Sequence, residues 1–262
     1  PKISNDDKEI NNNDLIITGS LDSTAKSWSL ESEKCVHTFR GHSSAITCLA
    51  KDFFGRILFT GSGDHTIKSW DIMNGQLLKV FNGHQATVLT LIAKNKLLYS
   101  TSSDHTARCW VMDFGDCTRV FKDHGHSVSC LIENNGLILT GCGDGISRCF
   151  DAKSGTLKRS FKGHSGAINC LRVVSNRLFT GSFDGTLKIW DATELSAERS
   201  NLEGGNRSKS SFKGSKITIE NERATSSRSN NQSRNTFEKS DADSGFDDRD
   251  SRLTVPIRRI DK

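Results

Sequence analysis

Between Asp14 and Asp191 the chain repeats a pattern about 40 residues long, and this repetition limits the possible folds more than any other feature. An Asp recurs at steps of 42, 40, 40 and 40 residues, and a large aromatic residue follows each Asp by six positions. The Asp residues are Asp22, Asp64, Asp104, Asp144 and Asp184, and the aromatic residues are Trp28, Trp70, Trp110, Phe150 and Trp190. A His lies 20 to 22 residues before each of the last four Asp residues, at His42, His84, His124 and His164. A fixed period of this length indicates similar units that stack on one another.

Each full unit is predicted to contain four β-strands. In Leu178–Asp191 two strands flank a tight turn at residues 183–185, because an Asp-Gly pair between alternating apolar and polar residues favours a hairpin. An apolar strand such as Ala45–Ala50 follows each His, and a last strand such as Cys117–Phe121 precedes the next His. These two strands complete the four.

Four-stranded units at a period near 40 residues are typical of a β-propeller, an all-β fold in which each unit is one blade. The chain supplies about five blades. We expect the first blade to lack its innermost strand and the last to lack its outermost strand. Neither the polar residues before Asp14 nor those that follow Asp191 give a persuasive strand for closing a ring. The sequence therefore predicts part of a larger ring.

Composition divides the chain into three regions. Residues 14–195 are predicted to form the propeller, and all four Trp, the Tyr and all eight Cys lie before Asp191. Residues 1–13 are polar and Asn-rich, and we interpret them as a loop or linker. Residues 196–262 are rich in Ser, Arg and Asn, with too few apolar residues to offset the entropy of ordering, so we predict a disordered tail. Within this tail, residues 216–219 are an alternative strand and residues 254–260 a candidate docking peptide.

Charge and hydropathy narrow the classes of partner. A net charge of +5 is small for this length and gives no reason to expect nucleic-acid binding. No run of 18 apolar residues and no signal peptide is present, so no membrane partner is predicted. The chain begins with Pro1. We expect the initiator end to be missing, which leaves a targeting segment possible.

The cysteines follow the repeat. Three strand positions are shared: the first by Cys48, Cys130 and Cys170, the second by Cys109 and Cys149, and the third by Cys35 and Cys117. No Cys-x-x-Cys motif occurs, so zinc ligation is not predicted. Cysteines at repeated strand positions are explained as small core side chains that stay reduced. Because thiols stay reduced in the cytoplasm and the nucleus, we expect a cytoplasmic or nuclear protein.

Each full unit also supplies a His, a Ser or Thr and an Asp, a set of residue types found in nucleophilic catalysis. Repetition argues against that interpretation, because a catalytic site is needed once and this set recurs four times. A chain of hydrogen bonds from the indole through the hydroxyl and the imidazole to a buried carboxylate would join three strands and a turn. We therefore predict a structural role and no catalytic residue.

With these residues in register, residues 14–191 resemble the WD-repeat β-propeller family. The resemblance implies four structural tetrads. They are His42, Thr60, Asp64 and Trp70; His84, Ser100, Asp104 and Trp110; His124, Thr140, Asp144 and Phe150; and His164, Thr180, Asp184 and Trp190. The first unit retains Thr18, Asp22 and Trp28. The hydroxyl partner stays open, because Ser62, Ser102 and Ser182 lie two residues nearer the Asp.

The fourth unit departs from the pattern. Phe150 replaces Trp and removes the indole donor, so this unit should be less tightly joined. Its His follows Asp123 where the other three follow Gly. His126 offers a second register, but the alignment of FKDH with FKGH favours His124.

The resemblance implies a protein-interaction scaffold without cofactor, metal or catalysis. Leu21 and Phe183 are the candidate partner-binding residues, because an apolar side chain beside a tight turn is poorly explained by folding alone. The alternative for Phe183 is that its ring covers its own hairpin. The alternative function is substrate recognition within a ubiquitin ligase, since F-box proteins with WD repeats share such blades. An enzyme is the third class, and no unrepeated set of residues supports it.

Overall fold

The computed structural model describes residues 15–193 and 217–220. The chain divides into two units, residues 1–222 and 223–262, and all described residues belong to the first. The described residues form five antiparallel sheets.

Sheet 1 contains β1 (Leu15–Gly19), β2 (Ala25–Ser29) and β3 (Cys35–Phe39). Sheet 2 contains β4 (Ile46–Lys51), β5 (Ile57–Ser62), β6 (Ile67–Asp71) and β7 (Leu77–Phe81). Sheet 3 contains β8 (Val88–Lys94), β9 (Leu97–Ser102), β10 (Ala107–Val111) and β11 (Cys117–Phe121). Sheet 4 contains β12 (Val128–Asn134), β13 (Leu137–Cys142), β14 (Ile146–Asp151) and β15 (Leu157–Lys162). Sheet 5 contains β16 (Ile168–Val174), β17 (Arg177–Ser182), β18 (Thr186–Asp191) and β19 (Ile217–Glu220).

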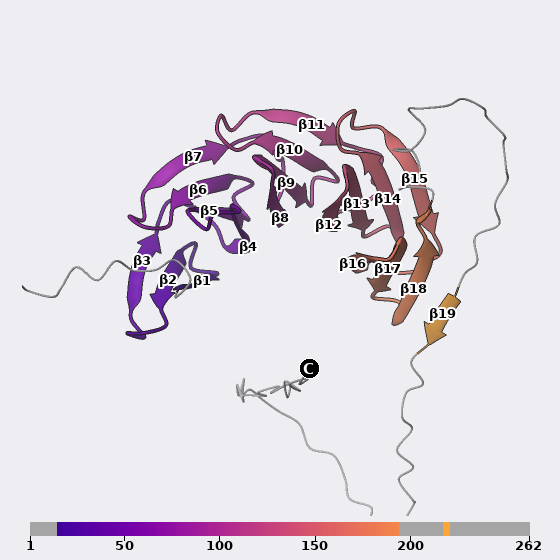
Figure 1. Cartoon of the computed structure of the whole chain (residues 1–262), viewed down its shortest axis with the longest axis horizontal. Coiled ribbons are helices and arrows are strands. Elements are labelled where there is room, and N and C mark those ends of the chain that lie inside the picture. Colours follow the sequence, from indigo (N-terminus) through magenta and orange to yellow (C-terminus); the bar gives the residue numbers. More distant parts are fainter. Residues whose placement is uncertain (1–14, 194–216, 221–262) are drawn as a thin grey trace, which may run out of the picture. The chain divides into compact units, whose positions relative to one another are not determined.

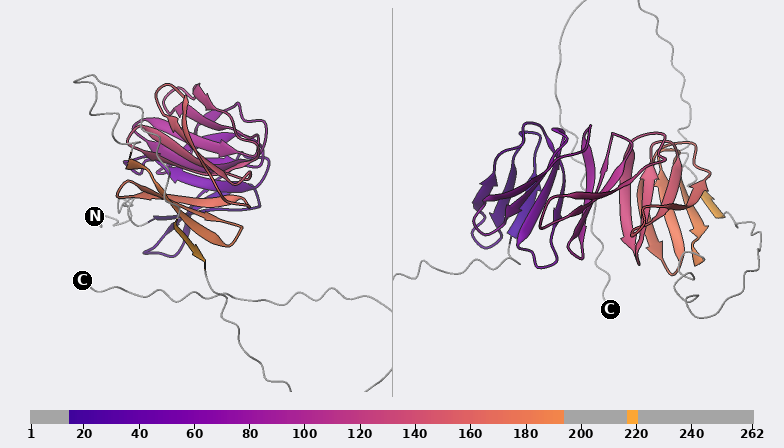
Figure 2. Two further views of the ribbon diagram at one scale, coloured as in Figure 1. Left: turned by 90° about the vertical axis from the view of Figure 1, so that its right-hand side faces the viewer. Right: turned by 90° about the horizontal axis from the view of Figure 1, so that it is seen from above.

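The sheets follow one another in chain order along a curve, with β4, β8, β12 and β16 on its inner side and β7, β11 and β15 on its outer side (Figure 1). Seen from above, neighbouring sheets stand face to face (right-hand view of Figure 2). Each of sheets 2 to 4 therefore has one face toward the preceding sheet and one toward the following sheet. This arrangement is the predicted all-β architecture of propeller blades.

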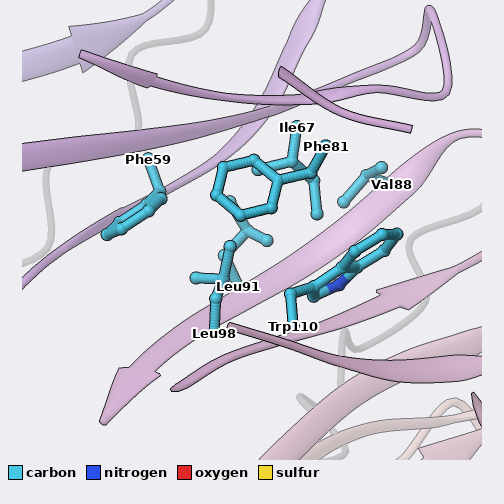
Figure 3. Packing of buried hydrophobic residues seen from close by; sticks show 7 residues of the cluster. All are labelled: Phe59, Ile67, Phe81, Val88, Leu91, Leu98 and Trp110. Carbon is cyan, nitrogen blue, oxygen red and sulfur yellow. The ribbon is translucent and has the colours of Figure 1, made fainter. Parts of the chain in front are cut away.

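Apolar side chains fill the space between neighbouring sheets. Between sheets 2 and 3, Phe59 and Phe81 pack against Leu98 and Trp110 (Figure 3). The rings of Phe81 and Trp110 meet edge to face with centroids 6.1 Å apart. Aromatic pairs of this kind contribute about 0.5–1.5 kcal/mol beyond the area they bury. The same register positions supply a cluster at each of the other three interfaces, so one sequence pattern builds all four.

The predicted turn Asp shapes the loop between the second and third strands of each unit. In the second unit, Asp64 Oδ1 accepts a hydrogen bond from the backbone N–H of Thr66 at 2.9 Å. The intervening residue has a positive φ in every sheet, and glycine takes this position only in sheets 4 and 5. In sheets 1 to 3 the position is filled by Ser23, His65 and His105. The Asp acceptor holds the turn even where glycine is absent.

Sheet 2 differs from its neighbours in the loop between its first two strands. Sheets 3, 4 and 5 join these strands by two residues with positive φ, whereas Asp52–Arg56 joins β4 to β5. Asp52 Oδ1 accepts hydrogen bonds from the backbone N–H groups of Arg56 and Ile57 at 2.7 and 2.8 Å. The longer loop is therefore held in one conformation by its own carboxylate.

The two ends of the array give one confirmation and one correction. Within the described residues, sheet 1 has three strands and no innermost one, which agrees with the prediction. The prediction that the last blade lacks its outermost strand is wrong, because β19 pairs with β18 from Thr186 to Ile189. The prediction of a disordered tail is therefore also wrong for Ile217–Glu220. The β-branched residues of β19 favour extended pairing, and the entropy of closing a longer loop grows slowly with its length.

The remaining predictions for the two chain ends, at residues 1–13 and in the rest of 196–262, lie outside the described residues. Among the residues that the structure describes, none belongs to a helix with the length and apolar composition needed to cross a bilayer. All eight cysteines are free thiols.

Candidate functional site

The second sheet shows the full hydrogen-bonded tetrad. The Trp70 indole N–H donates to Thr60 Oγ1 at 2.9 Å, and that hydroxyl lies 2.7 Å from His42 Nε2. His42 Nδ1 lies 2.7 Å from Asp64 Oδ2. A proton on Nδ1 satisfies every contact, because the imidazole then donates to the carboxylate and accepts from the hydroxyl. Thr60, two residues before Ser62, is thus the hydroxyl that joins His42 and Trp70.

Sheets 3 and 5 repeat this arrangement. Trp110 donates to Ser100 at 2.8 Å, and His84 contacts Ser100 and Asp104 at 2.7 Å each. In sheet 5, Trp190 donates to Thr180 at 2.9 Å, and His164 contacts Thr180 and Asp184 at 2.8 Å each. In sheet 1, Trp28 donates to Thr18 at 2.9 Å. Asp22 of that sheet holds its own turn through Thr24.

A different role is found for the three Ser residues nearer the turn, Ser62, Ser102 and Ser182. Each hydroxyl donates to a backbone carbonyl beyond the His of its own unit, as Ser62 does to Ser44 at 2.9 Å. Each also accepts from the N–H of the turn Asp, as Ser62 does from Asp64 at 3.1 Å. They brace the turn and take no part in the tetrads.

The tetrads shift the pKa of their titratable groups. Burial raises the pKa of Asp64, but hydrogen bonds from Thr66, His42 and Ser43 outweigh it and lower the pKa to about 2. The pKa values of Asp104 and Asp184 are lowered by the same balance. Burial also lowers the pKa of His42 and His84, which keeps both rings neutral near pH 7. A neutral imidazole beside a carboxylate is compatible with the hydrogen-bond geometry, since its Nδ1–H donates to the carboxylate and its Nε2 accepts from the hydroxyl.

The fourth sheet corrects the expected tetrad. His124 Nε2 lies 2.9 Å from Thr140 Oγ1, as in the other tetrads. The Asp144 carboxylate, however, accepts two hydrogen bonds from the Arg148 guanidinium, at 2.8 and 3.2 Å, in place of one from His124. Within the described part of the chain, His124 Nδ1 is buried without a hydrogen-bond partner of acceptable geometry. The sequence predicted the loss of the Phe150 donor but not the loss of the His124–Asp144 contact.

Ile146 explains why Asp144 changes partner. In the other four units a Thr two residues after the turn Asp donates its hydroxyl to the carboxylate, as Thr66 does to Asp64 at 2.7 Å. Ile146 cannot donate, and Arg148 supplies two charged donors from the same strand. The sequence signal was present, because Ile146 interrupts a column that is otherwise Thr24, Thr66, Thr106 and Thr186.

These changes alter the electrostatics of His124. Burial and the nearby Arg148 cation lower the pKa of its imidazole to about 4, while the backbone of His105 and the more distant Asp144 carboxylate oppose the shift weakly. Arg148 holds the pKa of Asp144 below its usual range against the opposing effect of burial. Across the described residues, no group of three or more His, Cys, Asp or Glu side chains is placed to hold a metal ion.

The two predicted partner-binding residues lie at the surface. Leu21 is 87% exposed and Phe183 is 78% exposed, each beside the turn Asp of its unit. The three intervening units carry Gly63, Ser103 and Gly143 at this position. Large apolar side chains therefore occur only in sheets 1 and 5 among these five loops.

Sequence reasoning missed a second exposed apolar pair. Phe53 and Phe54 are 91% and 76% exposed at the tip of the β4–β5 loop, and their rings meet edge to face with centroids 5.3 Å apart. The signal was the 42-residue step between Asp22 and Asp64, which is two residues longer than the others and coincides with this longer loop.

Comparisons with known proteins agree with this geometry. The family model for the WD domain, G-beta repeat, matches residues 33–71, 75–111, 115–151 and 155–191. These segments coincide with the repeats and contain the six-residue step from each turn Asp to its aromatic residue.

Two curated relatives match over short segments. WD repeat-containing protein 86 of Homo sapiens is 47% identical over 45 residues, 17% of this chain and 12% of that protein. The run Cys149–Gly155, together with the similar repeats beside it, resembles this relative. WD repeat-containing protein pop2 of Schizosaccharomyces pombe is 50% identical over 34 residues, 13% of this chain and 5% of that protein. The chain thus matches only a small part of either relative.

Two solved structures of computationally designed proteins share the fold. The Ika8 protein aligns with a TM-score of 0.64 and 31% identity over 68% of this chain and 55% of its own. The Ika4 protein aligns with a TM-score of 0.55 and 33% identity over 58% of this chain and 94% of its own.

Proposed function

Since the chain belongs to the WD-repeat family, we propose that it is a non-catalytic scaffold that binds other proteins through the loops of its propeller faces. Proteins built from WD repeats generally act as protein-interaction scaffolds. The repetition of the tetrads supports a structural role for them, because the same contacts join the same strands in sheets 2, 3 and 5.

The observation that carries this proposal is the exposure of Phe183. Its ring lies beside a turn that is already held by Asp184, which accepts hydrogen bonds from the backbone N–H and the hydroxyl of Thr186 at 2.9 and 2.7 Å. The Phe183 N–H donates to the Ala167 carbonyl at 2.9 Å, so the backbone is fixed independently of the side chain. An exposed aromatic ring on a fixed backbone gives a partner contact area at little cost in entropy. This exposure supports an interface role over a role in covering its own hairpin.

Phe183→Ala tests the proposal. We expect reduced partner capture from a lysate and a change in unfolding free energy within about 0.5 kcal/mol, as for exposed positions without special contacts. Phe114→Ala is a matched control, because Phe114 is a similarly exposed ring on the β10–β11 loop. A clear fall in melting temperature with undiminished capture would contradict the interface role of Phe183.

The free thiols support a cytoplasmic or nuclear location as part of the same proposal, since disulfides form in oxidising compartments. Imaging of a tagged full chain in cells tests it, and accumulation in the secretory pathway would exclude it.

A further inference from the structure

The β4–β5 loop carries two adjacent exposed rings that the repeat does not require. Sheets 3, 4 and 5 join their first two strands by two residues, so blades of this fold form without the extra residues of the 52–56 loop. Phe53 and Phe54 are exposed at the tip of the loop, and their edge-to-face contact presents them as one apolar surface. Packing of one sheet against the next therefore does not explain these two side chains.

The base of the loop is fixed, so the two rings project from a rigid support. The Asp52 carboxylate accepts hydrogen bonds from the backbone N–H groups of Arg56 and Ile57 at 2.7 and 2.8 Å. The Arg56 carbonyl in turn accepts from the N–H of Ile72 at 2.9 Å, which ties the loop to the β6–β7 loop of the same sheet. A fixed backbone reduces the entropy lost when exposed side chains become immobilised in a contact.

Two cations flank the rings, and the loop has a net positive charge. Lys51 and Arg56 are exposed at its two ends, and its one carboxylate, Asp52, is engaged by backbone N–H groups. Lys51 Nζ lies 3.7 Å from the site of a Cβ added to Gly55, so the ammonium group stays over the loop. Among the described residues, neither Lys51 nor Arg56 takes part in a salt bridge.

The neighbouring loop adds a third cation. β4 and β8 lie side by side (Figure 1), and Thr47 near the start of β4 donates to the carbonyl of Val88 at the start of β8, so both strands run in the same direction. The β8–β9 turn therefore lies on the same face of the array as the β4–β5 loop. Lys96 of this turn is exposed, whereas Lys94 is paired with Glu133. The rings thus lie on a face where exposed cations surround them.

We propose that Phe53 and Phe54, with Lys51, Arg56 and Lys96, bind the surface of a bilayer that contains anionic lipids. The two rings enter the boundary between headgroups and acyl chains, and the three cations lie at the level of the anionic headgroups. A bilayer accepts a protruding group anywhere on its surface, whereas a protein partner needs a concave apolar site of matching shape with carboxylates at its rim. The exposed and convex form of the pair therefore favours the lipid surface.

This proposal differs from the earlier predictions in two respects. No membrane partner was predicted because the chain has no run of 18 apolar residues, but that criterion concerns segments that cross a bilayer. A loop that enters only the surface needs no such run. The proposal also goes beyond the proposed function, because its ligand is a lipid surface and not a protein.

Phe183 and Lys122 are matched controls on the other face. The strands of each sheet are antiparallel, so loops between second and third strands lie at the opposite ends of the strands from the β4–β5 loop. Phe183 is a single exposed ring in such a loop of sheet 5. Lys122 is exposed just before the inner strand of sheet 4, at the same opposite end. The two faces can therefore be tested separately.

Sedimentation of the full chain with vesicles tests the proposal. We expect binding to vesicles of phosphatidylcholine with about one third phosphatidylserine, and binding at least about tenfold weaker to phosphatidylcholine alone. Phe53→Ala and Phe54→Ala should each weaken binding at least about tenfold, because each removes a ring from the lipid contact. Phe183→Ala should leave it unchanged. A chain that does not bind the anionic vesicles, or a double Phe53→Ala/Phe54→Ala variant that binds as well as the wild type, overturns the proposal.

Charge removal tests the role of the cations. Lys51→Gln and Arg56→Gln should each weaken binding to the anionic vesicles about fivefold, as expected for one basic residue near an anionic surface. Lys122→Gln should have no effect. An equal loss in Lys122→Gln would mean that net charge alone causes the binding, and the proposal would be wrong.

Phe54→Trp locates the contact. On anionic vesicles with brominated acyl chains, the added Trp should lose fluorescence relative to the wild type, because bromine quenches an indole that has entered the acyl region. Binding without this quenching would place the contact on another surface and overturn the proposal. If the vesicles do not bind and the double Phe53→Ala/Phe54→Ala variant captures less protein from a lysate, a protein pocket takes the rings and the proposal is wrong.

The outcome is independent of the proposed function. Partner capture that depends on Phe183 should be unchanged in the double Phe53→Ala/Phe54→Ala variant, and vesicle binding should be unchanged in Phe183→Ala. Each proposal can therefore fail while the other holds.

Discussion

The second and fourth sheets share one backbone pattern but hold their central polar groups differently. In sheet 2, the Asp64 carboxylate accepts from a neutral ring and from the Thr66 hydroxyl. In sheet 4, the Asp144 carboxylate is paired with the Arg148 guanidinium, and His124 is left with one nitrogen unpaired. The strand pairing between the second and third strands is nevertheless the same in both sheets.

This difference shows that the same blade backbone forms with two different sets of donors to the turn carboxylate. A turn carboxylate must have donors, and either a Thr-His pair or a nearby Arg can provide them. When Arg148 provides the donors, the His124 Nδ1 atom is buried without a hydrogen-bond partner among the described residues, which is unfavourable. The tetrad is therefore coupled to its turn, because Ile146 stands where the other units have a turn Thr and the contact between His124 and Asp144 is lost in the same sheet.

The largest effect is expected from Asp144→Ala. Arg148 would be left buried without its carboxylate, which costs about 3–5 kcal/mol of unfolding free energy. Asp64→Ala in sheet 2 leaves neutral donors unpaired and should cost about 1–3 kcal/mol. Chemical denaturation of both variants checks the order. Asp144→Ala/Arg148→Met should recover most of the loss, and a double variant no more stable than the single one would contradict the ion-pair interpretation.

The second prediction concerns pH. The unfolded chain protonates His124 near pH 6.5, whereas the folded chain does so only near pH 4, so stability falls as the pH drops from about 6.5 to 4. The difference corresponds to about 3 kcal/mol for this residue. His124→Gln should remove that part of the pH dependence, and NMR titration should show His124 protonating near pH 4. A His124 titration near pH 6.5 would show that Arg148 and burial do not act as described.

Trp70→Phe makes sheet 2 resemble sheet 4. It removes the indole donor to Thr60 and leaves a small space, at an expected cost of about 2 kcal/mol. Thermal and denaturant unfolding measure it. Phe81→Leu, which removes a ring that packs on Trp110 but leaves every hydrogen bond of the sheet 2 tetrad in place, is the control for packing alone. If Trp70→Phe lowers the unfolding free energy no more than Phe81→Leu does, the indole hydrogen bond contributes nothing to stability.

The smallest effect is expected from Ile146→Thr, which restores the missing hydroxyl. Asp144 gains a donor like that of Asp64, worth about 1 kcal/mol, and is drawn toward His124. The pKa of His124 should therefore rise above 4, which NMR titration can follow. Ile146→Val, without a hydroxyl, should leave that pKa unchanged. If the pKa of His124 rises in both variants, the cause is the smaller side-chain volume and not the Thr hydroxyl.

Much of the fold could be predicted from particular residues. The turn Asp and the aromatic residue six positions later located the central hairpin of every unit, because an Asx turn and alternating burial are local properties. Strand Cys117–Phe121 was predicted at its observed bounds. Strand β19 was predicted only as an alternative strand at residues 216–219, and its pairing with β18 was not predicted, because that pairing depends on the open edge of β18, which the local sequence does not show.

The site was predicted less completely. Phe150 was recognised as a lost donor, since it stands in a column of Trp. The pairing of Asp144 with Arg148 could be recognised only in the three-dimensional structure. Arg148 lies four residues after Asp144, on the strand that follows the turn, and packing sets the direction of its side chain. Phe53 and Phe54 were overlooked because the 42-residue step marks an insertion in the repeat but does not show which inserted side chains stay exposed.

The sequence alone determined the repeating unit, the central hairpin of each unit and its turn Asp and aromatic residue, because these depend on short-range turn chemistry and on alternation along each strand. The tertiary structure decided which carboxylate meets which donor, which apolar side chains stay exposed, and which strand β19 pairs with. These outcomes depend on residues brought together from different units, and only packing of sheet against sheet fixes their distances.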